Sequence, residues 1–357
     1  MDVFNEHPLK KRRGRLLWMI AGAVVCLLVL FAGAAYYVDS QLQPTALSDT
    51  VKTVTIPSGS SVPQIAAILK QAGLIRNETL FTYYARFEGS GNKLQAGTYQ
   101  FHPGQTIDQL LTAMANGDTY VETVKFTIPE GWNTEQIARS LEEKGIVKKQ
   151  DFLREVNEGK FPEYPFVADI PQKEGRKYRL EGYLFPETYE FKKGATAHEV
   201  VAKLLGQFEK ELKPEWLDTL NKRKLSLDDA VNLASIVERE VVSDRERPIV
   251  AGVFFNRMRE SWLLQSCATV QFVLGKQRDR ITLDDLKIDS PYNTYIHPGL
   301  PPGPIANPGR ASLAAVVNPA VHDYFFFVTK KDGSSEHYFS KTYQEHLARD
   351  AKSRGNF

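Results

Sequence analysis

Two segments of this sequence carry side chains suited to acid–base chemistry. One is a largely apolar stretch, residues 230–242, that holds two glutamates, Glu238 and Glu240. The other is a loop, residues 290–309, that is rich in proline and glycine and also contains tyrosine and asparagine. A carboxyl among apolar neighbours tends to keep its proton, and a loop stiffened by proline is suited to form the wall of a preformed cleft. The combination indicates an acid that acts on a glycosidic bond.

The first segment is predicted to be a helix that ends close to Glu240. Ser226, followed three residues later by Asp229, is typical of a helix start, which places the first turn near Leu227. At about 100° per residue, the polar residues of the helix form one stripe, and neither glutamate lies in it. An alternative is that both glutamates form ion pairs with arginines of residues 239–247 on a partly exposed helix. Periodicity alone does not separate the two interpretations.

Several longer motifs resemble those of the YceG-like endolytic murein transglycosylases. The matching segments are residues 180–191, 234–240, 253–257, 264–271 and 292–309, together with a late pattern of His337, Phe339, Thr342, Glu345 and His346. The resemblance covers the chain from its apolar N-terminal segment to its C-terminus, in the order that the family shows. One departure is Cys267-Ala268, which stands where the family usually has Asp-Pro.

The resemblance implies a lytic transglycosylase that cuts peptidoglycan strands internally, between MurNAc and GlcNAc, and leaves 1,6-anhydro-MurNAc ends. The essential acid of the family matches Glu240, and Glu238 is either its neighbour in the site or the acid itself. One carboxyl suffices in such an enzyme, because the C6 hydroxyl of the sugar replaces water as the nucleophile. The family also suggests coupling to peptidoglycan synthases and a role in ending glycan polymerisation.

Two alternatives to this function remain open at the level of the sequence. A hydrolytic muramidase would need a second carboxylate across the cleft, for which Glu181 and Asp244 are candidates. A non-enzymatic scaffold of the wall-synthesis machinery would bind glycan without cutting it.

Other residues are candidates for contact with the sugar. Tyr183, Tyr292 and Tyr295 combine an aromatic face with a polar tip, and Gln271 and Asn293 are neutral amides that suit N-acetyl or hydroxyl groups. Glu181 begins another of the matching motifs and is the next candidate for a functional carboxylate. Its structural alternative is a buried ion pair with Arg179 or Arg257.

The N-terminus predicts a membrane anchor. A basic cluster within residues 1–15 precedes an uncharged run, residues 16–38, which as a helix is long enough to span a bilayer. The positive-inside rule keeps the tail 1–15 in the cytoplasm and places the rest outside the bacterial cytoplasmic (inner) membrane, in the periplasm or its extracytoplasmic equivalent. The alternative is a cleaved signal peptide, since Ala32-Gly-Ala34 resembles a cleavage site.

Composition excludes some classes of partner and cofactor. Without residues 1–15 the chain keeps 40 basic and 41 acidic residues of its total 45 and 43, so a nucleic-acid partner is not expected. The two cysteines are not expected to form a disulfide, because Cys26 lies in the predicted membrane span and Cys267 is then alone, and no Cys/His spacing suggests zinc. We therefore expect no metal and no cofactor.

The remaining chain contains an internal duplication. The pattern of residues 54–73 recurs 72 residues later at 126–145, and residues 98–106 are echoed by 188–196. Each unit predicts strands and helices in alternation, and therefore an α+β fold. The expected order is a linker at 39–50, a first unit at 51–118, a second repeat-like α+β segment at 119–174 and an α+β catalytic domain at 175–357. The resemblance implies that the first unit is a LysM-like module, and the alternative is a spacer without a ligand.

Overall fold

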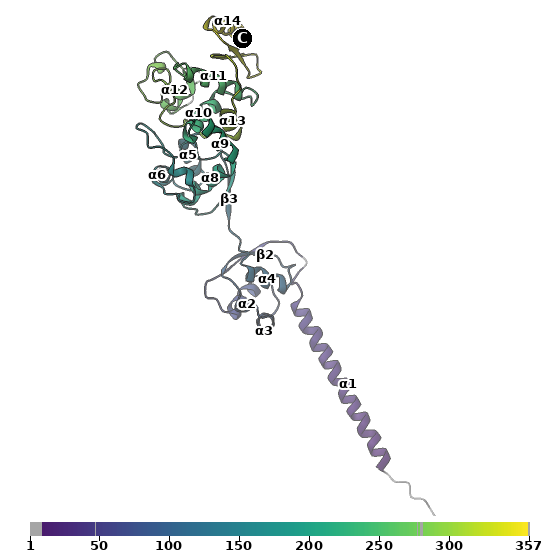
Figure 1. Cartoon of the computed structure of the whole chain (residues 1–357). Helices are drawn as coiled ribbons and strands as arrows, with labels where there is room; N and C mark the ends of the chain where they lie inside the picture. Colours follow the sequence, from purple (N-terminus) through teal and green to yellow (C-terminus); the bar gives the residue numbers. More distant parts are fainter. Residues whose placement is uncertain (1–8, 47, 277, 279–280, 356–357) are drawn as a thin grey trace, which may run out of the picture. The chain divides into compact units, whose positions relative to one another are not determined.

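The computed structural model of the chain describes residues 9–46, 48–276, 278 and 281–355. The chain divides into two compact units, Met1–Glu122 (unit 1) and Thr123–Phe357 (unit 2). Each unit has its own cluster of buried hydrophobic side chains. Strands and helices alternate in both units, which confirms the α+β expectation (Figure 1).

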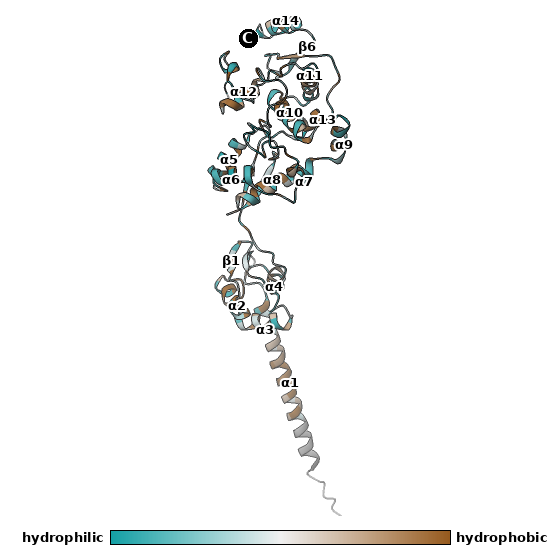
Figure 2. Cartoon of the chain, turned by 60° about the vertical axis from the view of Figure 1, so that its left-hand side comes forward, coloured by the Kyte–Doolittle hydropathy of each residue, from teal (hydrophilic) through white to brown (hydrophobic). Residues whose placement is uncertain are grey.

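The N-terminal helix α1 runs from Leu9 to Leu42. Its segment from Trp18 onward is long and apolar enough to cross a membrane, with a mean hydropathy of 2.4. The side chains of this segment are largely exposed and mostly hydrophobic (Figure 2). The helix continues past Val38 into the predicted linker, because no glycine or proline interrupts it before Pro44.

Unit 1 packs a two-stranded antiparallel sheet against three short helices. Its elements are β1 (Lys52–Ile56), α2 (Val62–Gln71), α3 (Glu78–Phe87), β2 (Gly97–Phe101) and α4 (Ile107–Asn116). Val54 lies opposite Tyr99 in the sheet, and the buried residues of β1 alternate with exposed ones, as expected for a sheet with one face on the core. The core extends from Val54 to Met114, within the module predicted at 51–118.

The first part of unit 2 repeats this arrangement. Its elements are β3 (Thr123–Thr127), α5 (Thr134–Glu143), α6 (Lys149–Glu158), α7 (Pro165–Ala168), β4 (Thr188–Lys192) and α8 (Ala197–Glu211). The hydroxyls of Thr55 and Thr98 lie 3.0 Å apart across the first sheet, and those of Thr127 and Thr188 lie 3.0 Å apart across the second. Equivalent helices begin with equivalent capping boxes in the two repeats. The structure therefore confirms the duplication.

The domain boundary expected near residue 175 is not present. Strand β3 pairs with β4, which lies beyond that position, so one sheet joins the segment 119–174 to the rest of the chain. A single hydrophobic core runs from Phe126 to Val317. The expectation relied on local sequence similarity, which marks the repeat but does not show that the second copy shares its core with the C-terminal part.

The remainder of unit 2 surrounds a buried central helix, α10 (Leu227–Glu240), with side chains from Ala230 to Val237 out of contact with solvent. Helix α10 contacts α9 (Pro214–Lys222), α11 (Arg247–Arg259), α12 (Cys267–Leu274) and α13 (Arg310–Val317) (Figure 1). A short 3₁₀ helix, η1, spans Asp285–Lys287. The chain ends with the hairpin of β5 (Phe326–Thr329) and β6 (His337–Ser340), followed by α14 (Tyr343–Arg354).

Candidate active site

Glu240 is the last residue of α10. As predicted, the helix starts at Leu227, and the Ser226 hydroxyl accepts a hydrogen bond from the Asp229 backbone N–H at 3.0 Å. The chain turns into an extended conformation at Val241. This ending places the Glu240 side chain at the rim of the buried helix, where it is only half-buried.

Two groups at the start of α12 orient the Glu240 carboxyl. The hydroxyl of Ser266, the N-cap residue, donates a short hydrogen bond to Oε1, and the backbone N–H of Ala268 lies 3.5 Å from the same oxygen. Ala268, one of the two residues that replace the usual Asp-Pro of the family, therefore contributes to this contact through its backbone.

Glu240 lines a cavity of about 350 Å³. Other lining residues come from α11, α12, the 290–309 loop, the β5–β6 hairpin and α14; they include Arg257, Gln265, Cys267, Tyr295, Phe326, His337 and His346. The cavity is therefore built by segments that are up to about a hundred residues apart in the sequence. Most of the residues that line the cavity belong to the motifs shared with the family. Their place in those motifs is the sequence signal by which they could have been identified as site residues.

Arg257 and Tyr295 are held firmly in the cavity wall. The Arg257 guanidinium donates to the carbonyls of Phe325 at 2.7 Å and Leu264 at 2.6 Å, and burial lowers its pKa. The Tyr295 hydroxyl lies 3.0 Å from the sulfur of Cys267, and burial raises the pKa of Tyr295 well above its usual value. Both can therefore present hydrogen-bond donors to a ligand beside Glu240 at neutral pH.

Glu238 lies outside this cavity and has a structural role. Its carboxylate pairs with Arg247 at 3.1 Å and accepts the Gly309 backbone N–H at 3.0 Å. The side chains of Glu238 and Arg247 are 5% and 6% exposed, and Arg247 also donates to Ser312 at 2.6 Å. The ion-pair alternative is thus correct for Glu238, and its assignment as a catalytic residue is not supported. Helix phase could not show this, because Arg247 lies on the next helix.

Glu181 is also inside the protein and not on the cavity. It is 1% exposed, and its oxygens accept from the Thr134 backbone N–H and from the Asn307 amide, each at 3.0 Å. Burial raises the pKa of Glu181 to about 7, against the opposing effect of the hydrogen bonds from Thr134. The expected substrate contact is therefore excluded by burial, and the alternative partners, Arg179 and Arg257, are not bound to it.

Asn307 is a buried residue that sequence reasoning missed. Its side-chain oxygen accepts the backbone N–H groups of Gly182 and Leu184, both at 2.9 Å, and its amide donates to the Trp132 carbonyl at 2.9 Å. Together with its hydrogen bond to Glu181, these contacts connect the 290–309 loop to the segment around Trp132 and to residues 181–184. Its place at the end of the proline-rich loop was the available signal.

Tyr183 has a structural role in the same interior. Its ring is 1% exposed, and its hydroxyl donates to Asp228 at 3.0 Å. Asp228 in turn pairs with Arg176 at 2.8 Å. Burial raises the pKa of Tyr183, so the hydroxyl remains a donor to the carboxylate. Contact between Tyr183 and a sugar is excluded by its burial.

The loop residues divide between structure and surface. Asn293 is fully buried; its amide donates to the carbonyls of Leu286 and Ile288, both at 2.9 Å, and its oxygen accepts the Tyr295 N–H at 3.0 Å. Tyr292 is 5% exposed and accepts a hydrogen bond from the Lys177 backbone at 3.0 Å. These two residues shape the loop from inside, which contradicts the expectation that they contact substrate.

The polar stripe of α10 explains how the loop is attached. Asn232 donates to the Pro301 carbonyl at 2.7 Å, and the Ser235 hydroxyl accepts the Ile305 N–H at 3.0 Å. The stripe is therefore buried beneath the loop, whose backbone it satisfies. The predicted pairing of this helix with the loop is confirmed, and it delivers Tyr295 to the Glu240 cavity.

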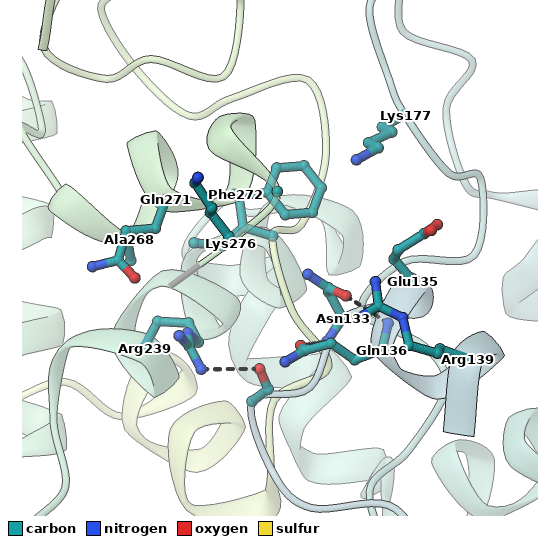
Figure 3. Close-up of a pocket in the computed structure, with 13 residues that line it drawn as sticks. Asn133, Glu135, Gln136, Arg139, Lys177, Arg239, Ala268, Gln271, Phe272 and Lys276 are labelled. Carbon is teal, nitrogen blue, oxygen red and sulfur yellow. Dashed lines mark hydrogen bonds between the residues drawn. The ribbon is translucent and has the colours of Figure 1, made fainter. Parts of the chain in front are cut away.

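Gln271 lies on a second cavity, of about 290 Å³, between α5 and α12. Figure 3 shows residues of α12 on one wall of this cavity and residues of α5 on the opposite wall. Arg239 and Ala268 also line it. The Ala268 N–H lies 3.5 Å from the carboxyl of Glu240, which lines the first cavity, so the two cavities adjoin at the end of α10.

Comparisons with known proteins agree with the motifs. A family model described as the YceG-like family matches residues 54–352. The chain is 35% identical over 325 residues to the endolytic murein transglycosylase of Bacillus subtilis, an alignment that covers 89% of each protein. It is 33% identical over 319 residues to the endolytic murein transglycosylase of Streptococcus pneumoniae strain D39, covering 84% of this chain and 58% of that protein.

A solved structure of a YceG-like protein from Listeria monocytogenes is similar as well. It is 34% identical to this chain, with a TM-score of 0.57, and the match covers 84% of this chain and 99% of that one.

Proposed function

This chain belongs to the YceG-like family, and from that premise we propose that it is an endolytic murein transglycosylase, with Glu240 as its catalytic acid and base. The observation that carries the assignment is the position of Glu240. Among the described residues that line its cavity, Glu240 is the only one with a carboxyl group.

A single carboxyl in the cavity favours a lytic reaction over hydrolysis. A hydrolase usually needs two carboxylates that flank the scissile bond. Neither candidate for the second one fits: Glu181 is buried, and Asp244 pairs with Arg247 at 2.9 Å and does not line the cavity. The hydrolytic alternative therefore has Glu240 but neither of the two candidates for its second carboxylate.

The proposed reaction moves one proton through Glu240 and consumes no water. The protonated carboxyl gives its proton to the oxygen between MurNAc and GlcNAc as the bond from that oxygen to C1 of MurNAc breaks. The C6 oxygen of the same MurNAc forms a new bond to C1, and its hydroxyl proton passes to the Glu240 carboxylate. The products are a GlcNAc hydroxyl and a 1,6-anhydro-MurNAc end, and the acid is regenerated.

Neighbouring groups support this use of Glu240. Ser266 and the Ala268 N–H fix one carboxyl oxygen, so the direction of proton transfer is set before the substrate binds. The donors of Arg257 and Tyr295 line the same space and suit the hydroxyl and N-acetyl oxygens of a sugar. The rings of Phe326 and Tyr343 add apolar surface for a sugar face.

The proposal extends to the place where the enzyme acts. Helix α1 serves as a single-pass anchor in the bacterial cytoplasmic membrane, with the basic tail inside and the chain after α1 outside. The part of unit 1 that follows α1 is the LysM-like module, supported by its β1–α2–α3–β2 order and the family membership of the chain. The expected partners are nascent glycan strands and the synthases that make them, for which termination of polymerisation is the proposed outcome.

The test is cleavage of purified murein strands by the full chain and by two isosteric variants. Glu240→Gln should lower turnover by about 10²–10⁴-fold, because an amide cannot cycle a proton. Glu238→Gln should affect stability more than turnover by folded protein, because it weakens a buried ion pair. Full turnover by folded Glu240→Gln would contradict the proposal, and intact strands with the wild-type protein would favour the scaffold alternative.

A further inference from the structure

The second cavity, beside the Glu240 cavity, carries an excess of positive charge. Four of its lining residues are basic, namely Arg139, Lys177, Arg239 and Lys276, and one is acidic, Glu135. They come from α5, the 171–187 connection, the end of α10 and the segment just after α12 (Figure 3). Basic side chains from four separate segments thus face one space and give it a positive potential that attracts anions.

The acidic residue of the cavity is already neutralised by other partners. Glu135 pairs with Lys149, which does not line the cavity, and accepts a hydrogen bond from the Tyr178 hydroxyl at 2.7 Å. Burial opposes ionisation of Glu135, but the contacts with Lys149 and Tyr178 prevail and lower its pKa. Glu135 therefore remains an anion that pairs with Lys149 and also attracts Lys177. One carboxylate, already paired, against four basic side chains leaves the cavity net positive.

Three of the basic side chains are exposed toward solvent: Arg139, Lys177 and Lys276. The Lys177 ammonium lies over the rings of Phe272 and Tyr178, at 5.1 Å and 5.5 Å from their centroids, which positions the charge without neutralising it. Arg239 donates to the Gly131 carbonyl at 3.4 Å. The cavity thus holds one anchored arginine and three cations that a ligand can reach.

The position of the basic cavity beside Glu240 indicates which part of the substrate reaches it. Arg239 precedes Glu240, and Ala268, whose N–H contacts the Glu240 carboxyl, lines this cavity, while Cys267 lines the other. A strand cut at Glu240 therefore brings its neighbouring groups to the basic cavity. The sugars of that strand are uncharged, and its carboxylates lie on the short peptide attached to the lactyl group of each MurNAc.

We propose that the basic cavity between α5 and α12 binds the carboxylates of this peptide stem and so selects strands that carry stems. This inference rests on the proposed function, because the ligand is assigned from the position of the cavity beside Glu240. The alternative is a solvated charged surface with no ligand. Charge-assisted contacts to Arg139 and Lys276 would add affinity for the substrate without taking part in the bond-breaking step.

The test compares stem-bearing murein strands with the same strands after an amidase has removed the peptides. The variant is the full chain with Arg139→Gln and Lys276→Gln together, and the matched control is Lys222→Gln, an exposed lysine on α9 away from both cavities. On stem-bearing strands the double variant should raise KM by about tenfold with kcat unchanged. On denuded strands, the wild type and the double variant should have equal KM values, and the control should match the wild type on both substrates.

Two results would overturn the inference. An equal rise in the KM of the double variant on both substrates would show that the cations serve the glycan or the fold. An unchanged KM on both substrates would show that the cavity has no ligand. A binding measurement with Glu240→Gln separates this inference from the catalytic proposal, because it needs no turnover. That variant should bind stem-bearing fragments about tenfold more tightly than denuded ones, a preference that salt reduces. Equal binding at low salt would refute stem recognition even if the enzyme cuts murein as proposed.

Discussion

Replacement of Asn293 by alanine should damage stability and not the chemistry. Asn293 has 0% exposed surface, and its side chain makes three hydrogen bonds to backbone groups, at 2.9, 2.9 and 3.0 Å. Alanine leaves the carbonyls of Leu286 and Ile288 and the N–H of Tyr295 without these partners inside the protein. This outcome reverses what the sequence suggested for a loop amide.

The expected magnitude follows from the three lost bonds. At about 1 kcal/mol each, the free energy of unfolding of unit 2 should fall by about 3 kcal/mol. For a domain of about 200 residues, each kcal/mol lowers the unfolding midpoint by about 2–4 °C, so Asn293→Ala should lower it by about 6–12 °C. Asn293→Asp should also destabilise, because a carboxylate would face two carbonyl oxygens.

Tryptophan fluorescence can follow this unfolding in the full chain, because Trp132, Trp216 and Trp262 lie in unit 2 and Trp18 lies in α1. The control is Asn221→Ala, which removes an exposed asparagine of α9 and should leave the midpoint within about 1–2 °C. An unchanged midpoint together with lost cleavage by Asn293→Ala would refute the structural role and return Asn293 to the substrate site.

Three further predictions address the buried charges and the anchor. As pH rises from about 4.5 to about 7, unfolded chains release the Glu181 proton before folded chains do, so the free energy of unfolding should fall by on the order of 3 kcal/mol. Urea titrations of Glu181→Gln across this pH range should lack that fall in unfolding free energy. The same pH dependence in Glu181→Gln and the wild type would contradict the prediction. Arg247→Ala should cost about 3–5 kcal/mol by leaving Glu238 buried without its cation, whereas Arg245→Ala, at an exposed site, should change urea stability little. The membrane-bound protein should retain its basic tail in N-terminal sequencing, and a mature end near Ala35 would show cleavage instead.

The duplication and the limits of α10 could be predicted from sequence because their signals are local. Each repeated helix starts with its own capping residues, and Ser226 begins α10 through a contact three residues away. These features need no knowledge of distant contacts. The strand partners did not follow from the duplication, because the pairing of β3 with β4 crosses the domain boundary that the sequence suggested.

The roles of individual polar residues could not be predicted in the same way. Helix phase put Glu238 and Glu240 in similar apolar surroundings, but Arg247 and Gly309 reach one of them and Ser266 reaches the other. Only the tertiary arrangement decides which carboxyl meets a cavity.

Buried amides and acids were the second source of error. Asn293 and Asn307 look like surface residues in a polar loop, yet both are fully buried and bond to the backbone. Glu181 was predicted to be functional because it begins one of the matching motifs, but it too is buried and accepts a backbone hydrogen bond. A polar residue that satisfies buried backbone groups and one that awaits a ligand have the same appearance in sequence, and burial separates them.

The most direct test of the central claim is the fate of water during cleavage. Murein strands are digested by the full chain in water enriched in oxygen-18, and the new ends are analysed by mass spectrometry. If Glu240 passes the proton between the glycosidic oxygen and the C6 hydroxyl, each new MurNAc end is one water lighter than a reducing end and carries no oxygen-18, and Glu240→Gln forms no such ends. Reducing ends labelled with oxygen-18 would contradict the account and identify a hydrolase.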